Sequence, residues 1–162
     1  MSGGAGAATT ASPRFANKED MMDKSYPITV DYSKSLTEMV KAGKYYCANS
    51  GINDFHFPTQ LTGKHKLKAE FVQYDCNISS KEVIADLDKR GFRPGTVHEL
   101  AALGKKYPNE QAEGPIVALG SVWGRGSGIR WVACLYDGGS RRKLGLNSGD
   151  WSADHRFLAF RK

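Results

Sequence analysis

The chain has 162 residues, of which 40% are hydrophobic and 25% are charged, and its formal net charge is +6 at pH 7. A chain of this length buries roughly 70% of its unfolded surface as one domain, and its composition excludes a wholly disordered protein. No stretch approaches the ~18 apolar residues of a membrane-spanning helix. Residues 1–10 lack the apolar segment of a secretory signal, so the sequence favours a cytoplasmic protein.

The cysteines give no indication of a metal site. Cys47, Cys76 and Cys134 are widely spaced and odd in number, with no Cys-x-x-Cys pair and no histidine at zinc-ligand spacing. One disulfide with a spare thiol is an alternative, but buried free thiols that behave as small hydrophobic side chains are favoured. The sequence therefore predicts neither a metal ion nor a cofactor.

The positive charge is concentrated late in the chain. Residues 1–115 contain 15 Lys/Arg and 14 Asp/Glu, whereas residues 116–162 contain eight and three. A basic segment of this kind indicates a nucleic acid or another acidic partner, or only a solvated surface.

The first part of the chain predicts a tail, a strand and a short helix. Residues 1–24, rich in Gly, Ala, Ser and Thr, are predicted to be a flexible tail or linker before a single domain at 25–162. Apolar and polar residues alternate over 28–32, which indicates a strand. Ser35 with Glu38 forms a capping-box signature, and Gly43 is expected to end the helix that follows.

The middle of the chain predicts an irregular segment, a strand and two helices. Residues 44–58 are expected to be irregular with a short strand at 45–48, and the alternation over 65–74 predicts a strand with one solvated face. Two further capping boxes, Ser79 with Glu82 and Thr96 with Glu99, predict helix starts. The segment 91–96 between these helices is predicted to be a tight turn.

The last part of the chain predicts short strands separated by glycine-rich turns. They are expected at 116–123, 129–136, 142–146 and 155–161. Runs of helices followed by runs of strands favour an α+β fold with mostly antiparallel short strands and two to three helices.

Enzymatic motifs are scarce. The glycine-rich segment 124–128 lacks the Gly-Lys-Ser/Thr ending of a phosphate-binding loop, and no helix pattern follows it. There is no Gly-x-Ser-x-Gly nucleophile motif, and His155 beside Asp154 is the only weak sign of acid–base chemistry. The sequence therefore favours a protein that is not an enzyme, with no catalytic residues.

Aromatic and basic residues are interleaved in the C-terminal segment. Trp, Tyr and Arg dominate binding hot spots, and Tyr, Ser, Gly and Asn are typical of adaptable recognition loops. Trp123 and Trp151 are expected to belong to the core, whereas Trp131 is equally compatible with core and surface. Aromatic side chains among arginines can also stack the bases of a single-stranded nucleic acid.

Three short motifs carry a family resemblance. They are Gly91-Phe92-Arg93-Pro94-Gly95-Thr96 with Glu99-Leu100, Ala118-Leu119-Gly120-Ser121-Val122-Trp123, and Arg156-Phe157-Leu158-Ala159-Phe160-Arg161. Together they resemble the helix opening, the Gly-Gly-Ser-Trp strand and the closing strand of bacterial C-type-lectin-fold domains of the formylglycine-generating-enzyme type. That resemblance covers about residue 26 onwards and implies that the N- and C-terminal strands are adjacent. The enzyme's pair of late cysteines is not present, since Cys134 stands alone.

A closer resemblance is to the variable proteins of diversity-generating retroelements. In those proteins an error-prone reverse transcriptase rewrites codons near the 3′ end of the gene, and a C-type-lectin fold displays the products as a ligand-binding surface. The resemblance implies a display segment at about 124–156, held by a frame of Trp123, Val132, Leu135, Leu144, Leu146, Trp151, Phe157 and Leu158. The ligand-binding positions that it implies are Arg125, Ser127, Trp131, Tyr136, Arg141, Lys143, Asn147, Ser148, Ser152, Asp154 and His155.

Two alternatives concern the ligand. The expected partner is a protein or another macromolecule, and a basic nucleic-acid-binding module using the same C-terminal face is the second hypothesis. Calcium-dependent sugar binding is not expected, because Asp137, Asn147, Asp150 and Asp154 occur without a Glu-Pro-Asn or Gln-Pro-Asp triplet.

Overall fold

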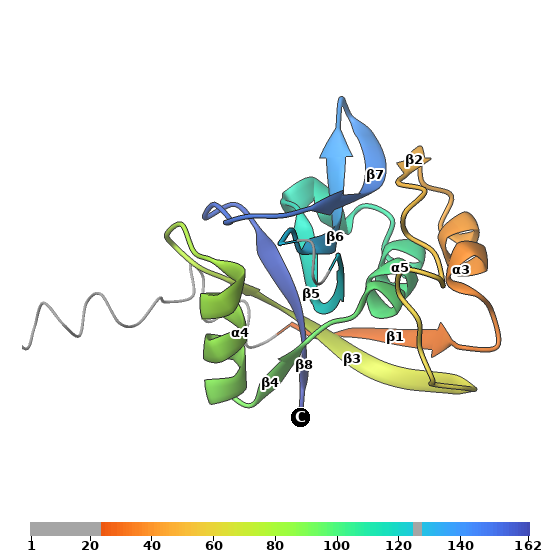
Figure 1. Ribbon diagram of the computed structural model, residues 1–162, viewed down its shortest axis with the longest axis horizontal. Coiled ribbons are helices and arrows are strands. Elements are labelled where there is room, and N and C mark those ends of the chain that lie inside the picture. Colours follow the sequence, from red (N-terminus) through yellow and green to blue (C-terminus); the bar gives the residue numbers. More distant parts are fainter. Residues whose placement is uncertain (1–23, 125–127) are drawn as a thin grey trace, which may run out of the picture.

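A computed structural model describes residues 24–124 and 128–162 of the chain (Figure 1). The helices are α3 (Leu36–Ala42), α4 (Ser80–Lys89) and α5 (Val97–Lys106), followed by the 3-10 turn η1 (Glu110–Glu113). The strands are β1 (Tyr26–Asp31), β2 (Cys47–Ala48), β3 (Lys64–Gln73), β4 (Phe92–Pro94), β5 (Ile116–Trp123), β6 (Trp131–Gly138), β7 (Arg141–Asn147) and β8 (Arg156–Arg161). The predicted α+β class is confirmed, whereas the predicted tail lies almost entirely outside the described residues.

All three predicted capping boxes start a helix. Ser35, Ser79 and Thr96 each accept a hydrogen bond from the backbone N–H three residues on, and the glutamate there accepts from the N-cap backbone. Each such cap contributes about 1 kcal/mol to helix stability. The caps therefore fix the helix starts that the sequence predicts.

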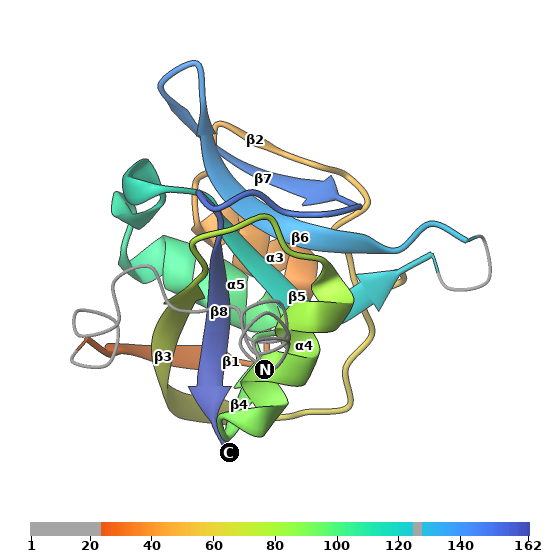
Figure 2. The ribbon, with the colours of Figure 1, turned by 90° about the vertical axis from the view of Figure 1, so that its left-hand side faces the viewer.

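The strands form one curled sheet of mixed direction (Figure 2). Its order is β1-β3-β8-β5-β6-β7-β2, and β4 pairs with β8 outside this path. The β5–β8 and β2–β7 pairs are parallel and the other pairs are antiparallel. The mostly antiparallel sheet agrees with the sequence prediction.

The first and last strands are not adjacent, so that expectation is wrong. The ten-residue strand β3 lies between them, because residues 64–69 pair with β1 and residues 70–73 pair with β8. Nothing in the alternating pattern of β3 indicates that one strand serves two partners in succession.

Each face of the sheet has its own hydrophobic core. Helices α3 and α5 pack on one face, over a cluster that includes Leu100, Leu135 and Leu158. Helix α4 covers the other face, where Leu87, Trp151 and Phe157 are buried together. Burial on both faces explains why the later half of β3 does not have the solvated face that its sequence predicts.

Two local expectations are corrected. The segment predicted as a tight turn contains β4, whose strand conformation comes from pairing of Phe92, Arg93 and Pro94 with β8 rather than from its own propensity. The cysteines are all free, but only Cys134 is buried, while Cys47 and Cys76 are exposed.

The backbone of the turn before α5 lies in close contact with the backbone of β5. Gly95 donates its N–H to Leu158 O at 2.8 Å, and Gly120 donates its N–H to Gly95 O at 2.7 Å. A Cβ atom at Gly120 would lie 2.6 Å from Pro94 O. The glycine at this position is therefore required by the close approach of two backbones.

Arg156 joins η1 to the sheet from within the protein. Its side chain is only 7% exposed and bonds Glu110 Oε2 at 2.8 Å, Glu110 O at 2.6 Å and Gly114 O at 2.8 Å. Its guanidinium carbon also lies 4.8 Å from the centre of the Phe71 ring. This charged cluster holds the connection between α5 and β5 against β8.

Candidate ligand-binding face

The β6–β7 hairpin carries many of the implied ligand-binding residues, and its register sorts them by face. Tyr136 lies opposite Lys143, and Gly138 lies opposite Arg141. Because side chains alternate along a strand, Tyr136, Lys143 and Arg141 share one face of the hairpin. The outer half of the hairpin thus presents an aromatic ring beside two cations.

Contacts on the hairpin hold these side chains in place. The Tyr136 ring lies over Gly145, and the aliphatic part of Lys143 lies over Gly138. The guanidinium of Arg141 stacks over the ring of Tyr46, with its central carbon 4.3 Å from the ring centre. Tyr46 is 62% exposed, so this stacked pair stands in solvent and can be contacted by a ligand.

Trp131 belongs to the opposite face of the same hairpin. It is an odd number of residues from Tyr136 along β6, and it pairs in register with Trp123 of β5. The Trp123 ring in turn stacks on His56, with ring centres 3.8 Å apart. The structure therefore does not bring Trp131 together with Tyr136 and Arg141.

Asn147 is the last residue of β7, and Ser148, which follows it, lines a groove of about 370 Å³. Apolar side chains line this groove together with the start of α4, and Ile84 and Ile129 are exposed to solvent there. The cations Lys81 and Arg130 also line it. Sequence reasoning missed these groove residues, because α4 and the segment after Gly128 are far apart in the chain and meet at this groove.

Ser152, Asp154 and His155 lie in the connection between β7 and β8. Trp151 anchors this connection, since its backbone pairs with Ile78 and its indole N–H donates to Ser80 Oγ at 2.8 Å. Ser152 Oγ lies 3.1 Å from His155 Nδ1.

The serine–histidine contact stabilises a turn. The backbone N–H of Ser152 also points to His155 Nδ1, at 3.3 Å, and the Asp154 N–H donates to Ser152 Oγ at 3.4 Å. All these bonds join residues at most three apart. The arrangement is that of a local side-chain turn.

The implied ligand-binding positions, called the displayed positions below, differ in burial from the implied frame. Every described position in the implied ligand-binding set is exposed or half-buried. Most of the implied frame is buried, whereas Trp123 and Leu146 are half-buried. Arg125 and Ser127 lie outside the described residues.

Much of the C-terminal positive charge is paired with other groups of the chain. Arg156, Arg161 and Lys162 form ion pairs with Glu110, Glu70 and Asp88. Arg142 donates to two backbone carbonyls and stacks over Tyr45, 4.3 Å from the ring centre. The basic excess therefore does not form one continuous patch on the hairpin.

The clear pKa shifts of the interior follow from burial. Desolvation raises the pKa of Tyr45 to about 12 and that of the Cys134 thiol to about 12. Burial lowers the pKa of His98, against the opposing effect of the nearby Asp54 and Glu99 carboxylates. Tyr45 packs against one core, Cys134 belongs to the other, and His98 is buried.

Comparisons of the chain with protein-family models, with curated proteins and with solved structures give no match. Within residues 24–124 and 128–162, no helix has the length and apolar character needed to cross a membrane. The same residues contain no group of three or more His, Cys, Asp or Glu side chains placed to hold a metal ion.

Proposed function

We propose that this chain is a non-enzymatic binding protein of the diversity-generating-retroelement type, with a C-type-lectin-like scaffold. The ligand is a protein or another macromolecule, contacted by the hairpin face around Tyr136, Arg141 and Lys143 and by the groove beside Ser148. The separation of exposed displayed positions from a buried frame carries this proposal. The separation of β1 from β8 departs from the family resemblance but leaves the display segment intact.

A rigid backbone beneath the displayed side chains lowers the entropic cost of binding a ligand. The displayed side chains project from paired strands and from a connection anchored by Trp151, so little backbone freedom is lost when a ligand binds. Exposed side chains away from specific contacts change stability by only about ±0.5 kcal/mol when they are replaced. Such a surface accepts many sequences on one fold.

Charge placement favours this function over the nucleic-acid module. Binding along a phosphate backbone requires a stripe of free cations. Here Arg142 and Arg156 are held by partners within the fold. This leaves the neighbouring Arg141 and Lys143 at one end of the hairpin and Arg130 at the other end, not a continuous stripe. A protein surface is therefore the better complement to the hairpin face.

Two matched libraries test the proposal. The first randomises Arg141, Lys143, Asn147, Ser148, Ser152 and Asp154, and the second randomises the frame positions Val132, Leu135, Leu144, Trp151, Phe157 and Leu158. We expect most members of the first library to fold with melting temperatures within a few degrees of the parent, and selection against hen lysozyme to yield binders. Members of the second should lose the cooperative transition, since each large-to-small core change costs about 2–5 kcal/mol.

Equal loss of folding in both libraries would contradict the proposal, because the displayed positions would then be structural. A well-folded first library that yields no binder against any protein tested would also contradict it.

A further inference from the structure

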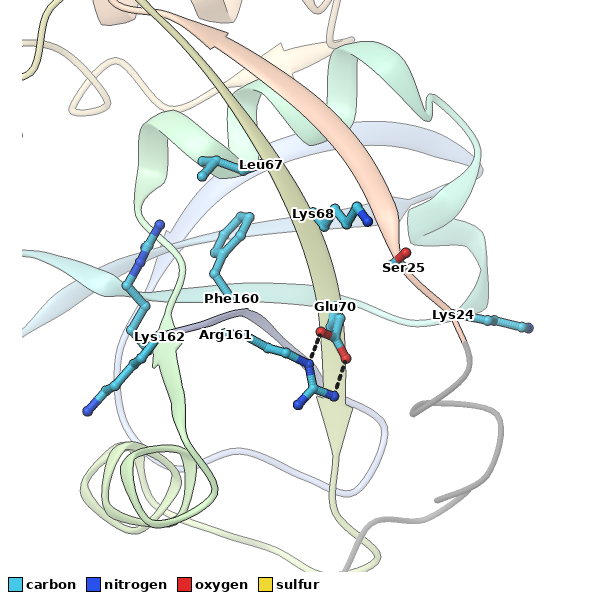
Figure 3. A pocket seen from close by; sticks show the side chains of 9 residues that line it. Lys24, Ser25, Leu67, Lys68, Glu70, Phe160, Arg161 and Lys162 are labelled. Atoms are coloured by element: carbon cyan, nitrogen blue, oxygen red, sulfur yellow. Dashed lines mark hydrogen bonds and ion pairs between the residues drawn. The ribbon is translucent and has the colours of Figure 1, made fainter.

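The sheet splits open between β3 and β8, at the end of the molecule away from the β6–β7 hairpin (Figures 1 and 3). The last pair of residues that joins these strands is Glu70 with Ala159. From there β3 continues along β1, while β8 continues along β4. The two strands diverge and leave a notch of about 620 Å³ between them.

Backbone hydrogen-bonding groups face this notch from both sides. Tyr32 N–H donates to Gly63 O, which fixes the register of β1 on β3. In that register the odd-numbered residues of β3 make the backbone hydrogen bonds to β1. The backbone groups of the even-numbered Lys66 and Lys68 therefore point away from β1. On β8, Leu158 O and Lys162 N–H bond the β4 segment, so the backbone groups of Arg161 point toward β3. Among the described residues no strand pairs with these edges.

The notch has one basic side and a second side on which the Arg93 guanidinium lies over Phe160 beside Leu67. Lys68, Glu70 and Arg161 share one face of the sheet, while Leu67 and Phe160 lie on the other face, above the main core (Figure 3). The charged residues that line it are Lys24, Lys68, Arg93, Arg161 and Lys162, against Glu70.

Two lysines are left to attract an anion. Arg161 is paired with Glu70, Arg93 with Glu99 and Lys162 with Asp88. Among the described residues, Lys24 and Lys68 take part in no ion pair, and both are exposed. The notch therefore keeps a positive charge that its own carboxylates do not neutralise.

We propose that this notch binds an extended acidic peptide segment of a partner protein, which adds as a strand beside Lys66 and Lys68 of β3. The backbone of the peptide pairs with the free edge groups of β3 and reaches Arg161 across the notch. Because side chains of a strand alternate, acidic residues face Lys68 while the intervening apolar residues lie on the side of the half-buried Leu67. The recognised pattern is thus acidic and apolar residues in alternation.

A peptide fits this notch better than a nucleic acid does. Binding of single strands relies on aromatic faces on which bases stack. Phe160 is only 3% exposed, and the Arg93 guanidinium covers its ring at 4.7 Å. The aligned backbone groups, in contrast, match what a strand requires.

The test uses a fluorescein-labelled peptide of about six residues, the usual length of a strand, in which glutamate and valine alternate. Fluorescence anisotropy should show saturable binding to the full chain. Lys68→Glu should weaken binding at least about tenfold, whereas Lys105→Glu, the same charge change at an exposed position of α5, should leave it within about twofold. The same peptide methylated on alternate backbone nitrogens should lose binding to the parent protein.

The controls separate this proposal from general charge attraction. A lysine–valine peptide should not bind, and oligo-dT should not compete. Absence of binding would overturn the proposal, as would equal effects of Lys68→Glu and Lys105→Glu, unchanged binding after methylation, or competition by oligo-dT. The methylated peptide tests the parent protein and so does not depend on the folding of any variant.

Discussion

Arg156→Met is expected to lower the free energy of unfolding by about 3–5 kcal/mol, because it leaves a partly buried carboxylate and two carbonyls without this donor. The Glu110 side chain is 13% exposed, and its partner is lost together with the bonds to Glu110 O and Gly114 O. Urea denaturation followed by circular dichroism measures the change. Methionine keeps most of the apolar contact with Phe71, so the loss reports the charged network.

Arg141→Met serves as the matched control, since Arg141 is exposed and its stacking on Tyr46 stands in solvent. The control should change stability by less than about 1 kcal/mol. Similar losses in the two variants would contradict the role assigned to Arg156.

Gly120→Ala is expected to cost about 3 kcal/mol, at the upper end of the usual overpacking penalty. The added Cβ would meet Pro94 O at 2.6 Å and Gly95 O at 2.7 Å, and both are backbone atoms fixed by the turn before α5. Relief requires β5 to move away from that turn. The measurement is again the midpoint of urea denaturation.

Gly138→Ala provides the contrast on the display hairpin. Its Cβ would meet the side chain of Lys143 at 3.1 Å, and that flexible chain can move aside. We expect a change of less than about 1 kcal/mol. If Gly120→Ala is as mild as Gly138→Ala, the close approach of β5 to the turn is not as tight as described.

The elements that the sequence predicts well are those fixed by local chemistry. The capping residues Ser35, Ser79 and Thr96 start their helices where expected, and the strand predicted at 116–123 has the observed bounds. These signals act within one turn or one strand, so a single sequence contains them.

Long-range pairing is what the sequence does not reveal. The strand β4 has only three residues, one of them a proline, and it is a strand because it pairs with β8. Insertion of β3 between β1 and β8 likewise depends on contacts between residues far apart in the chain. The insertion of β3 is the reason why the first and last strands are not adjacent, although the family resemblance implies that they would be.

The residues of the candidate face could likewise not be placed from the sequence alone. Alternation along β6 places Val132, Cys134 and Tyr136 on one face, and only the tertiary structure shows that the first two are buried while Tyr136 is half-buried. The placement of Trp131 on the opposite face from Arg141 follows from the register of β6 with β7. The groove residues Ile84 and Ile129 come from separate elements, and no sequence pattern joins them.

If the proposed function is right, the exposed positions of residues 124–156 vary between copies of the gene while the buried frame is kept. Deep sequencing of this gene and its flanking DNA across the source population tests it most directly. We predict substitutions at the codons of Arg141, Asn147, Ser148, Ser152 and Asp154, matched to adenines in a nearby template copy, and none at the codons of Val132, Leu135, Leu144 and Trp151. A uniform sequence without a template, or substitutions spread evenly over exposed and buried codons, would contradict a diversified binding protein.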